Sequence, residues 1–319
     1  MSSKLITAAQ AAEFLLGNDD FLILTHASPD GDTLGSGFAL NAALKQAGKH
    51  SRVLCPDPIP KKFKFLVPED EESFEPKTVL AVDVADEKLL GRLESEYSGK
   101  VKLCIDHHGS NLKYAEWLYL ESDSAAACEC VYNCIRAMGV TVTPYIADCL
   151  YLGMATDTGC FKFSNVTPRT HRYVAELMEL GADYDEINRI MFEVKSKSRI
   201  AMERMVLDGI EFCCSGRCAV ITVTKDMIES TGCEQTDLDG ITAISRQIEG
   251  VLIGVTVKEK GVFKVSLRTF EPYDASEICR EFGGGGHKRA AGCEFRKPLS
   301  EVKELLINKI TDIMETEKV

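Results

Sequence analysis

Aspartate and histidine residues gather in four short stretches in the first half of the 319-residue chain. Mixed carboxylate and imidazole groups suit Mn²⁺ and Mg²⁺, with Co²⁺ and Zn²⁺ as alternatives, when no thiolate takes part. Carboxylates crowded together without a cation would repel one another, and their pKa values would rise. The sequence therefore predicts a site for divalent cations. Its members would be drawn from His26, Asp30, Asp32, Asp83, Asp106, His107, His108 and Asp157.

Each stretch also has a simpler explanation. Asp30-Gly31 is typical of a turn, Asp83 would cap a strand, and His107-His108 is compatible with a buried core pair. Asp157 would cap a loop. All of these explanations would have to hold at once, at the ends of successive predicted strands, so a shared site is favoured. Two divalent cations about 3.5–4 Å apart are a recurring arrangement for hydrolysing phosphate esters. The pattern therefore predicts a two-metal phosphoesterase.

Short apolar runs, each followed by polar residues, predict the strands that would bring these groups together. The strands alternate with helices, which is typical of a parallel sheet with helices on both faces. Because the carboxyl ends of parallel strands lie at one edge of the sheet, the groups that follow them would meet there. We expect strands at 21–25, 52–54, 78–82 and 101–105, and helices at 34–49, 125–138, 144–154, 168–180 and 184–191.

The second half of the chain predicts a separate, smaller α/β domain. Residues 195–212 have the pattern of one longer helix, and residues 251–258 and 262–268 that of a hairpin. The expected organisation is a first domain at 1–192, a helical linker at 193–214 and a second domain at 215–319. Other expected elements are a strand at 218–223, helices at 225–230, 237–249 and 275–281, and a final helix at the C-terminus.

A run of glycines, 283–286, stands directly before His287. Glycines allow a phosphate to approach the backbone closely and to use its N–H groups, although a flexible turn is the alternative. The run is neither a P-loop nor a Rossmann fingerprint, because the residues that follow and the element spacing differ. Lys288 and Arg289 would be either phosphate partners or solvated charges, and the second interpretation is slightly favoured. Arg268, at a strand end, would bind phosphate or pair with a surface carboxylate.

Composition limits the classes of protein. The net charge of −12 argues against long-range capture of duplex DNA or RNA, whereas bound cations would still allow phosphate esters to be held. The 13 cysteines, several of them among apolar residues, predict reduced thiols rather than disulfides or a zinc site. The N-terminal residues lack a secretory pattern, and the apolar runs are too short to span a bilayer. We expect a cytoplasmic protein with no membrane partner.

At five places, in the same order, the sequence resembles the DHH phosphoesterase superfamily. Residues 25–32 with Gly35-Ser36, then Val82-Asp83, then 106–108, then 156–159 resemble its four motifs. Residues 283–292, GGGGHKRAAG, resemble the signature of the DHH-associated C-terminal domain. The Asp-His-His run alone would be a weak signal, but five motifs in order across nearly the whole chain are specific. The resemblance implies an N-terminal parallel-sheet domain joined by a helical linker to a smaller α/β domain.

The resemblance also implies a role for each residue. His26 and Asp30 would bind the first metal ion, and Asp83 would bridge both ions. His108 would face the scissile phosphate, and Asp106 would orient its neighbours. The other implied contacts are Asp32, His107 and Asp157 to the second metal ion, and Arg268, Gly284, Gly285, Gly286 and His287 to the substrate.

Within the superfamily, the length and the absence of extra modules resemble the stand-alone nanoRNases, which degrade oligoribonucleotides and dephosphorylate 3'-phosphoadenosine-5'-phosphate (pAp). The resemblance implies that RNA of two to five nucleotides enters a cleft between the domains. There, metal-generated hydroxide, most simply with Mn²⁺, would release mononucleotides. A phosphodiesterase for cyclic or linear dinucleotides (pGpG, pApA) is the alternative, and a catalytically silent nucleotide-binding regulator is a third interpretation. Base rates also favour a homodimer.

Overall fold

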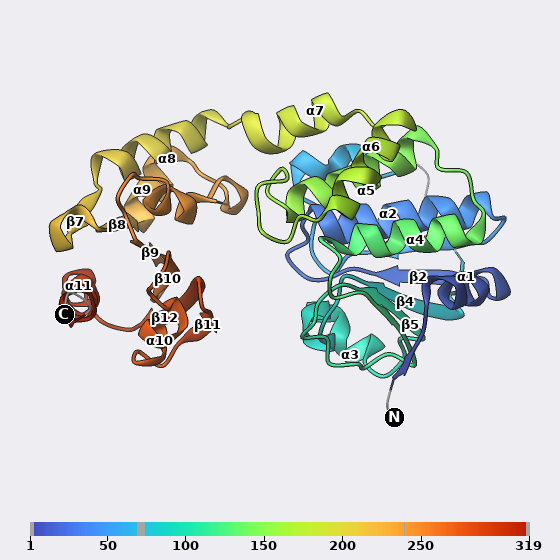
Figure 1. Ribbon diagram of the computed structural model, residues 1–319, viewed down its shortest axis with the longest axis horizontal. Helices are drawn as coiled ribbons and strands as arrows, with labels where there is room; N and C mark the ends of the chain where they lie inside the picture. Colours follow the sequence, from blue (N-terminus) through green and yellow to red (C-terminus); the bar gives the residue numbers. More distant parts are fainter. Residues whose placement is uncertain (1–2, 69–73, 239, 317–319) are drawn as a thin grey trace. The chain divides into compact units, whose positions relative to one another are not determined.

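The computed structural model describes residues 3–68, 74–238 and 240–316. The chain divides into two compact units, Met1–Val194 and Lys195–Val319. Each unit has its own six-stranded sheet (Figure 1). The predicted fold class, a parallel-sheet α/β domain followed by a smaller α/β domain, is confirmed. The residue bounds predicted for the domains and the linker stay predictions.

The sheet of the first unit is parallel throughout, with the strand order β1-β6-β5-β4-β2-β3. All four residues of β2 are buried, as expected for a central strand covered on both faces. The four strands predicted for this unit are present. The sequence pattern does not predict the two-residue β1 or the four-residue β6, which lie at one side of the sheet. The strands are β1 Lys4–Leu5, β2 Phe21–Leu24, β3 Ser51–Leu54, β4 Thr78–Val82, β5 Leu103–Asp106 and β6 Trp117–Leu120.

Helices cover both faces of this sheet, as predicted. Figure 1 shows α2, α4 and α5 on one side and α3 on the other. The larger apolar core lies under α1, α2, α4 and α5, and a smaller one on the opposite face includes Leu90 and Leu93 of a 3-10 helix, Glu87–Leu93. The helices are α1 Ala8–Gly17, α2 Gly31–Gln46, α3 Glu94–Tyr97, α4 Ala127–Met138, α5 Pro144–Asp157, α6 Pro168–Glu179 and α7 Tyr184–Asn188.

Two glycines of α2 allow α5 to pack unusually close. A Cβ atom at Gly35 would lie 2.3 Å from the carbonyl oxygen of Cys149, and one at Gly31 would lie 2.3 Å from Oγ1 of Thr156. These positions are one turn apart on the same helix face, so neither has room for a side chain. The close approach places Asp32 of α2 beside Asp157 at the end of α5.

The sheet of the second unit is mixed, with the order β11-β12-β10-β9-β8-β7. Only β8 and β9 pair in parallel. The predicted hairpin is confirmed as β9 and β10, and the glycine run forms a short strand, β11, paired with β12. The strands are β7 Glu211–Cys213, β8 Cys218–Val223, β9 Ile253–Glu259, β10 Phe263–Thr269, β11 Gly285–His287 and β12 Ala290–Phe295.

Two layers of helix cover this second sheet. One face packs on α10 and α11, and the other on α8, α9 and a 3-10 helix, Ile241–Arg246. The helix predicted at 237–249 is wrong: two 3-10 segments occur there, separated by Gly240, whose φ is +72°. The long helix predicted at 195–212 is shorter, because it ends at Asp208 and β7 follows. The helices are α8 Lys197–Asp208, α9 Lys225–Thr231, α10 Ala275–Arg280 and α11 Leu299–Thr316.

The cysteines and helix lengths agree with the compositional predictions. All 13 cysteines are free thiols, and Cys104, Cys149 and Cys279 are buried. Within the described ranges, each helix is too short or too polar to span a membrane.

Candidate metal centre

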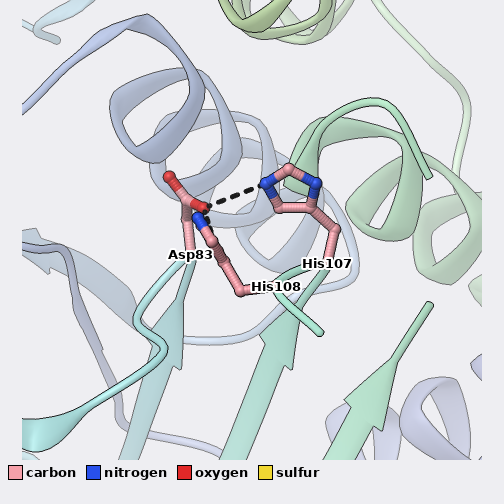
Figure 2. A group of neighbouring side chains, drawn as sticks. All are labelled: Asp83, His107 and His108. Carbon is pink, nitrogen blue, oxygen red and sulfur yellow. Dashed lines mark ion pairs between the residues drawn. The ribbon is translucent and has the colours of Figure 1, made fainter. Parts of the chain in front are cut away.

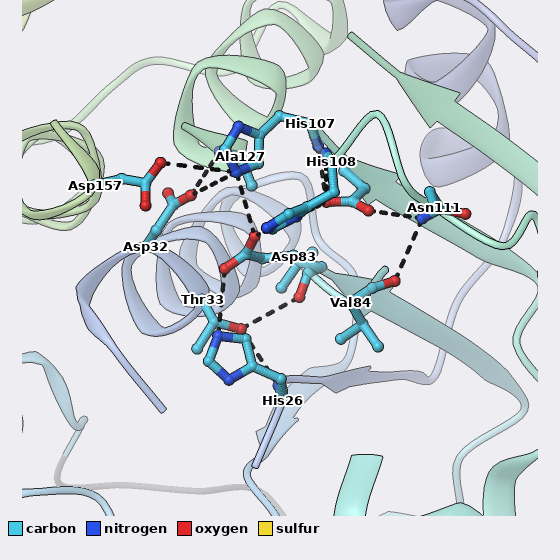
Figure 3. Close-up of polar contacts among 12 residues, drawn as sticks. His26, Asp32, Thr33, Asp83, Val84, His107, His108, Asn111, Ala127 and Asp157 are labelled. Carbon is cyan, nitrogen blue, oxygen red and sulfur yellow. Dashed lines mark hydrogen bonds and ion pairs between the residues drawn. The ribbon is translucent and has the colours of Figure 1, made fainter. Parts of the chain in front are cut away.

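The acidic and imidazole groups predicted as ligands meet at the carboxyl edge of the first sheet (Figure 3). His26 follows β2, Asp83 follows β4, and His107 follows β5. Asp32 lies in the first turn of α2, and Asp157 is the last residue of α5. The topology thus joins residues that are up to 131 positions apart in the sequence (157 − 26).

One group of potential ligands is formed by His26, Asp30 and Asp83. His26 Nε2 lies 3.6 Å from Asp30 Oδ1 and 3.5 Å from Asp83 Oδ2. The other ring nitrogen, Nδ1, donates to the carbonyl oxygen of Ala27 at 2.9 Å, which leaves Nε2 free to bind a cation. Asp30 also caps α2, because its Oδ1 accepts the backbone N–H groups of Asp32 and Thr33.

A second group is formed by Asp32, His107 and Asp157. His107 Nε2 lies 3.8 Å from Asp32 Oδ2 and 3.8 Å from Asp157 Oδ2. Nδ1 of His107 donates to the carbonyl oxygen of Ser124 at 3.2 Å, so again Nε2 faces the carboxylates. Neither group contains a thiolate, and each combines hard oxygen atoms with one imidazole nitrogen.

Asp83 joins the two groups. Its Oδ2 faces His26, while its Oδ1 lies 3.7 Å from His107 Nε2 and 3.5 Å from His108 Nδ1 (Figure 2). The side chain is buried, and Oδ1 has no hydrogen-bond partner. The backbone of Asp83 has φ = +58°, a left-handed conformation that is uncommon outside glycine and often found at functional sites. A buried carboxylate oxygen without a donor is what a bridging cation ligand requires.

The electrostatics of the centre also favour cations. Burial, reinforced by the charges of neighbouring carboxylates, raises the pKa of Asp32 to about 6 and that of Asp157 to about 7. The same two effects raise the pKa of Asp83 well above its usual value. Although burial opposes its charge, Asp30 and Asp83 raise the pKa of His26 to about 11. Without cations these groups hold extra protons, so divalent cations are the natural counter-charges. The residues present therefore fit two such ions.

The carboxylate of Asp106 is occupied by hydrogen bonds to its neighbours and does not belong to either group of potential ligands. Its Oδ1 accepts the backbone N–H groups of His107 and His108 at 2.8 and 3.2 Å, and also Nδ1–H of His108 at 2.9 Å. Its Oδ2 accepts Nδ2–H of Asn111 at 2.6 Å. Although Asp106 is buried, these donors hold its pKa below the usual value. The carboxylate therefore orients both histidines, and Asn111, which no motif singled out, orients the carboxylate.

His108 is placed differently from the other histidines. Its side chain is 44% exposed, and its Nδ1 is fixed by Asp106. The hydrogen bond to Asp106 raises the pKa of His108 to about 9. With Nδ1 bonded to Asp106, Nε2 stays available, and the protonated form of the ring would offer Nε2–H to a bound anion.

Another acidic cluster, formed by Asp19, Asp20 and His50, also has three potential ligand atoms close together. Asp20 Oδ2, however, lies 2.5 Å from Nζ of Lys77, and the side chain of His50 is 58% exposed. The lysine already offsets the charge of Asp20, so this exposed cluster provides a comparison for the buried centre.

Comparisons with known proteins identify the family. Residues 20–154 match the model of the DHH family, N-terminal domain, and residues 217–316 match the DHHA1 domain. The bifunctional oligoribonuclease and PAP phosphatase NrnA of Thermus thermophilus is 34% identical, over 86% of this chain and 83% of that protein. The chain belongs to the DHH family. Both the family and the type of second domain predicted from the motifs are confirmed.

Other proteins share sequence or fold with this chain. The protein of the same name from Bacillus subtilis is 24% identical, over 87% of this chain and 90% of that one. An exopolyphosphatase-related protein from Bacteroides fragilis superposes with a TM-score of 0.86 at 24% identity and covers 97% of each chain. RecJ of Thermus thermophilus in complex with Mn²⁺ has the same fold, with a TM-score of 0.54 at 14% identity, over 97% of this chain and 54% of RecJ.

The DHHA1 unit presents the two predicted substrate contacts on one face of its sheet. Arg268 of β10 is the register partner of Ala290 of β12, and Ala290 is the partner of His287 of β11. Residues directly opposite one another point to the same face, so the arginine and the histidine flank a small alanine. Two strand spacings separate their backbones, or about 9.5 Å. Such a row is suited to a phosphate-bearing ligand.

The predicted glycine contacts of this DHH protein differ from one another. At Gly284 a Cβ atom would lie 2.1 Å from the carbonyl oxygen of Gly292, and at Gly286, where φ is +146°, it would lie 2.6 Å from that of Ala290. Strand pairing thus requires glycine at both positions. Gly285 has open space around it, so it alone leaves room for a ligand to approach.

Sequence reasoning does not single out Arg246, which lies on the same face of the second sheet as Arg268. The 3-10 helix that ends at Arg246 crosses β9 at Gly254, where a Cβ atom would meet Ser245 Oγ at 2.5 Å. Gly254 is the register partner of Arg268. Burial, together with the charge of Arg246, lowers the pKa of Arg268. Neither arginine has a carboxylate partner among the residues that the structure describes. Only the path of this helix over the sheet reveals the pair.

Proposed function

We propose that this protein is a phosphoesterase that uses two divalent cations, most simply Mn²⁺, to hydrolyse RNA of two to five nucleotides to mononucleotides. We further propose that it removes the 3'-phosphate of pAp. Both activities are in the name of the Thermus thermophilus relative, which matches most of the chain. Short RNA, dinucleotides and pAp would be its ligands, and duplex DNA would not. A homodimer also stays a prediction.

The observation that carries the proposal is the pair of ligand groups that share Asp83. His26 and Asp30 would hold one cation, Asp32, His107 and Asp157 the other, and Asp83 would contact both. Bound divalent cations would supply polarisation of the phosphoryl group and a hydroxide nucleophile at neutral pH. The protein contributes the fixed positions of these ligands.

The other residues would act on the substrate. His108, protonated and held by Asp106, would donate a hydrogen bond to the reacting phosphate. Arg268 and His287 of the DHHA1 unit would bind another phosphate of the substrate, and Arg246 would add positive charge beside them. The backbone at Gly285 would be open to the ligand. Asp106 and Asn111 would act only through the histidines they orient.

A substrate panel tests the proposal. The purified protein with MnCl₂ would be given RNAs of 2, 3, 5 and 24 nucleotides, together with pAp, pGpG and cyclic di-AMP. We expect rapid hydrolysis of the short RNAs and of pAp, and slow hydrolysis of the 24-nucleotide RNA. Faster cleavage of cyclic di-AMP or pGpG than of short RNA and pAp would favour the dinucleotide phosphodiesterase. If the five-nucleotide RNA, pGpG and pAp all stay intact, the proposal is wrong.

A pair of histidine variants supplies the matched control. His26→Gln removes a ligand from the buried centre, whereas His50→Gln alters the surface cluster that contains Lys77. We expect the first variant to lose bound Mn²⁺ and activity and the second to keep both. A catalytically silent nucleotide-binding regulator would instead bind nucleotides equally well in both variants and hydrolyse none of them.

A further inference from the structure

The two groups of cation ligands are held in different ways. The first is held by its own neighbours in the sequence: His26 donates to Ala27, and Asp30 accepts from Asp32 and Thr33. None of these hydrogen bonds spans more than three residues. The β2–α2 connection therefore positions His26 and Asp30 locally, whereas Asp83 follows β4 and also faces the second group.

The second group depends on one remote segment, Ser124–Cys128, which leads into α4. His107 donates to the carbonyl oxygen of Ser124 at 3.2 Å. The carboxylate of Asp32 accepts the backbone N–H groups of Ala127 and Cys128 at 2.6 and 2.9 Å (Figure 3). These N–H groups belong to the start of α4, where the helix dipole also favours a carboxylate. Two of the three ligands thus rest directly on this segment.

Asn165 connects the third ligand to the same segment. Its Nδ2 donates to the carbonyl oxygen of Ala125 at 2.9 Å and to that of Asp157 at 3.2 Å. The side-chain amide therefore bridges the Ser124–Cys128 segment and the end of α5. All three ligands of the second group are linked to five consecutive residues.

Arg169, in the first turn of α6, fixes this segment from both ends. Its Nη2 donates to Ser124 Oγ at 2.8 Å, and its Nε lies 3.2 Å from Glu129 Oε2. Its Nη1 lies 3.3 Å from Glu121 Oε2. Glu129 is fully buried and also accepts the hydroxyl of Thr170 at 2.6 Å. A planar guanidinium can satisfy these separate acceptors at once, which a single ammonium group cannot do.

We propose that Arg169 and Asn165 are positioning residues for the second cation of the centre. They hold Ser124–Cys128 in the one conformation in which Asp32, His107 and Asp157 converge. The inference rests on the proposed two-cation function. It extends that function by making affinity at one cation position depend on residues that touch neither cation nor substrate.

A purely structural role for Arg169, as the counter-ion of Glu129, is the competing explanation. A structural role would lower stability and weaken both cation positions together. A positioning role weakens only the second. The test therefore needs the two affinities separately, and activity alone is not sufficient.

Calorimetric titration with Mn²⁺ separates the two positions, and electron paramagnetic resonance distinguishes paired from isolated Mn²⁺. Arg169→Lys keeps a positive charge beside Glu129, and Asn165→Ala alters an exposed residue, so both variants are expected to fold. Arg136→Met is the matched control, because Arg136 also joins α4 to α6, through Glu176 at 3.3 Å, but at the other end of α4. Thermal unfolding in EDTA monitors the folds of all three.

We expect two Mn²⁺ ions in the wild type. In Arg169→Lys and Asn165→Ala the affinity at one of the two positions should fall about 10–100-fold while the other is unchanged, and the paired signal should give way to an isolated one. Arg136→Met should match the wild type. Wild-type binding in both test variants, or an equal fall at both positions, would overturn this inference alone. Fewer than two Mn²⁺ in the wild type would overturn the proposed two-cation function and this inference with it.

Discussion

The two units of this protein differ in how far their functional polar side chains are buried. In the first unit, Asp32, Asp83 and Asp106 are at most 3% exposed, and each is placed by neighbouring backbone or side chains. In the DHHA1 unit, His287 is exposed and Arg268 is half-buried, and register places both on the same face of the sheet. Buried carboxylates are costly unless a cation or a donor faces them, whereas exposed basic groups cost little. The first arrangement is suited to permanently bound cations and the second to a ligand that is exchanged at each turnover.

The largest effect that would test this contrast comes from Asp83→Asn, which keeps the shape of the bridging ligand and removes its charge. We expect Mn²⁺ content to fall and kcat/KM to drop about 10³-fold or more, since several kcal/mol of phosphoryl stabilisation depend on the cations. The unfolding temperature in EDTA should not fall, because a buried carboxylate oxygen without a donor is removed. Metal analysis measures the Mn²⁺ content, an activity assay measures kcat/KM, and calorimetry measures the unfolding temperature. If the variant still holds two cations, the buried carboxylate of Asp83 is not needed to bind them, and the contrast between the two units fails.

His108→Gln should separate chemistry from cation binding within the first unit. His108 is oriented by Asp106 and partly exposed, so its loss should leave the cation ligands in place. We expect kcat to fall about 10²–10⁴-fold with Mn²⁺ content unchanged, the range typical of a group that assists proton transfer. His107→Gln, by contrast, should lower Mn²⁺ content. Equal metal loss in both variants would show that the two neighbouring histidines do not have separate roles.

Arg268→Met and His287→Gln test the role of the second unit. A hydrogen bond to a charged phosphate contributes about 1.5–3 kcal/mol, so KM for short RNA should rise about 10–100-fold with Mn²⁺ content unchanged. Lys264→Met is the control, because Lys264 lies on the same strand but pairs with Glu294 at 3.0 Å. A rise in KM for Lys264→Met as large as for Arg268→Met would show that net charge, not this row of residues, binds the substrate.

The smallest effects concern the glycines of β11. Gly286→Ala should destabilise the second unit by about 1–3 kcal/mol, because φ is +146° and Cβ would lie 2.6 Å from the carbonyl oxygen of Ala290. Gly285→Ala, with open space around it, should change stability little. The only tryptophan, Trp117, belongs to the first unit. Urea unfolding followed by circular dichroism should therefore shift for Gly286→Ala, while Trp117 fluorescence should not. A shift of both signals would show that the units unfold together.

Much of the fold could be predicted from the sequence because its signals are local. The apolar runs at β2, β3, β4 and β5 and the β9–β10 hairpin have clear patterns and are present. The failures also have local causes. Gly240 interrupts the apolar pattern that predicts a helix at 237–249, and α2 begins earlier than expected because Asp30 caps it. Short strands such as β1 and β11 form only because neighbouring strands are there to accept them.

The sequence by itself indicated which residues are available as ligands, since the first four motifs supply the carboxylate and imidazole groups that the chemistry requires. It also indicated, through the alternation of strands with helices and the residues at the strand ends, that they share one edge of a sheet. Tertiary structure decided the rest: that Asp83 has an oxygen for each ligand group, that Asp106 faces the histidines, and that Arg246 lies beside Arg268. It also placed Arg169 beside the segment Ser124–Cys128, to which Asp32 and His107 are hydrogen-bonded. These relations depend on hydrogen bonds and register between residues far apart in the chain, and no local pattern encodes which distant groups will meet.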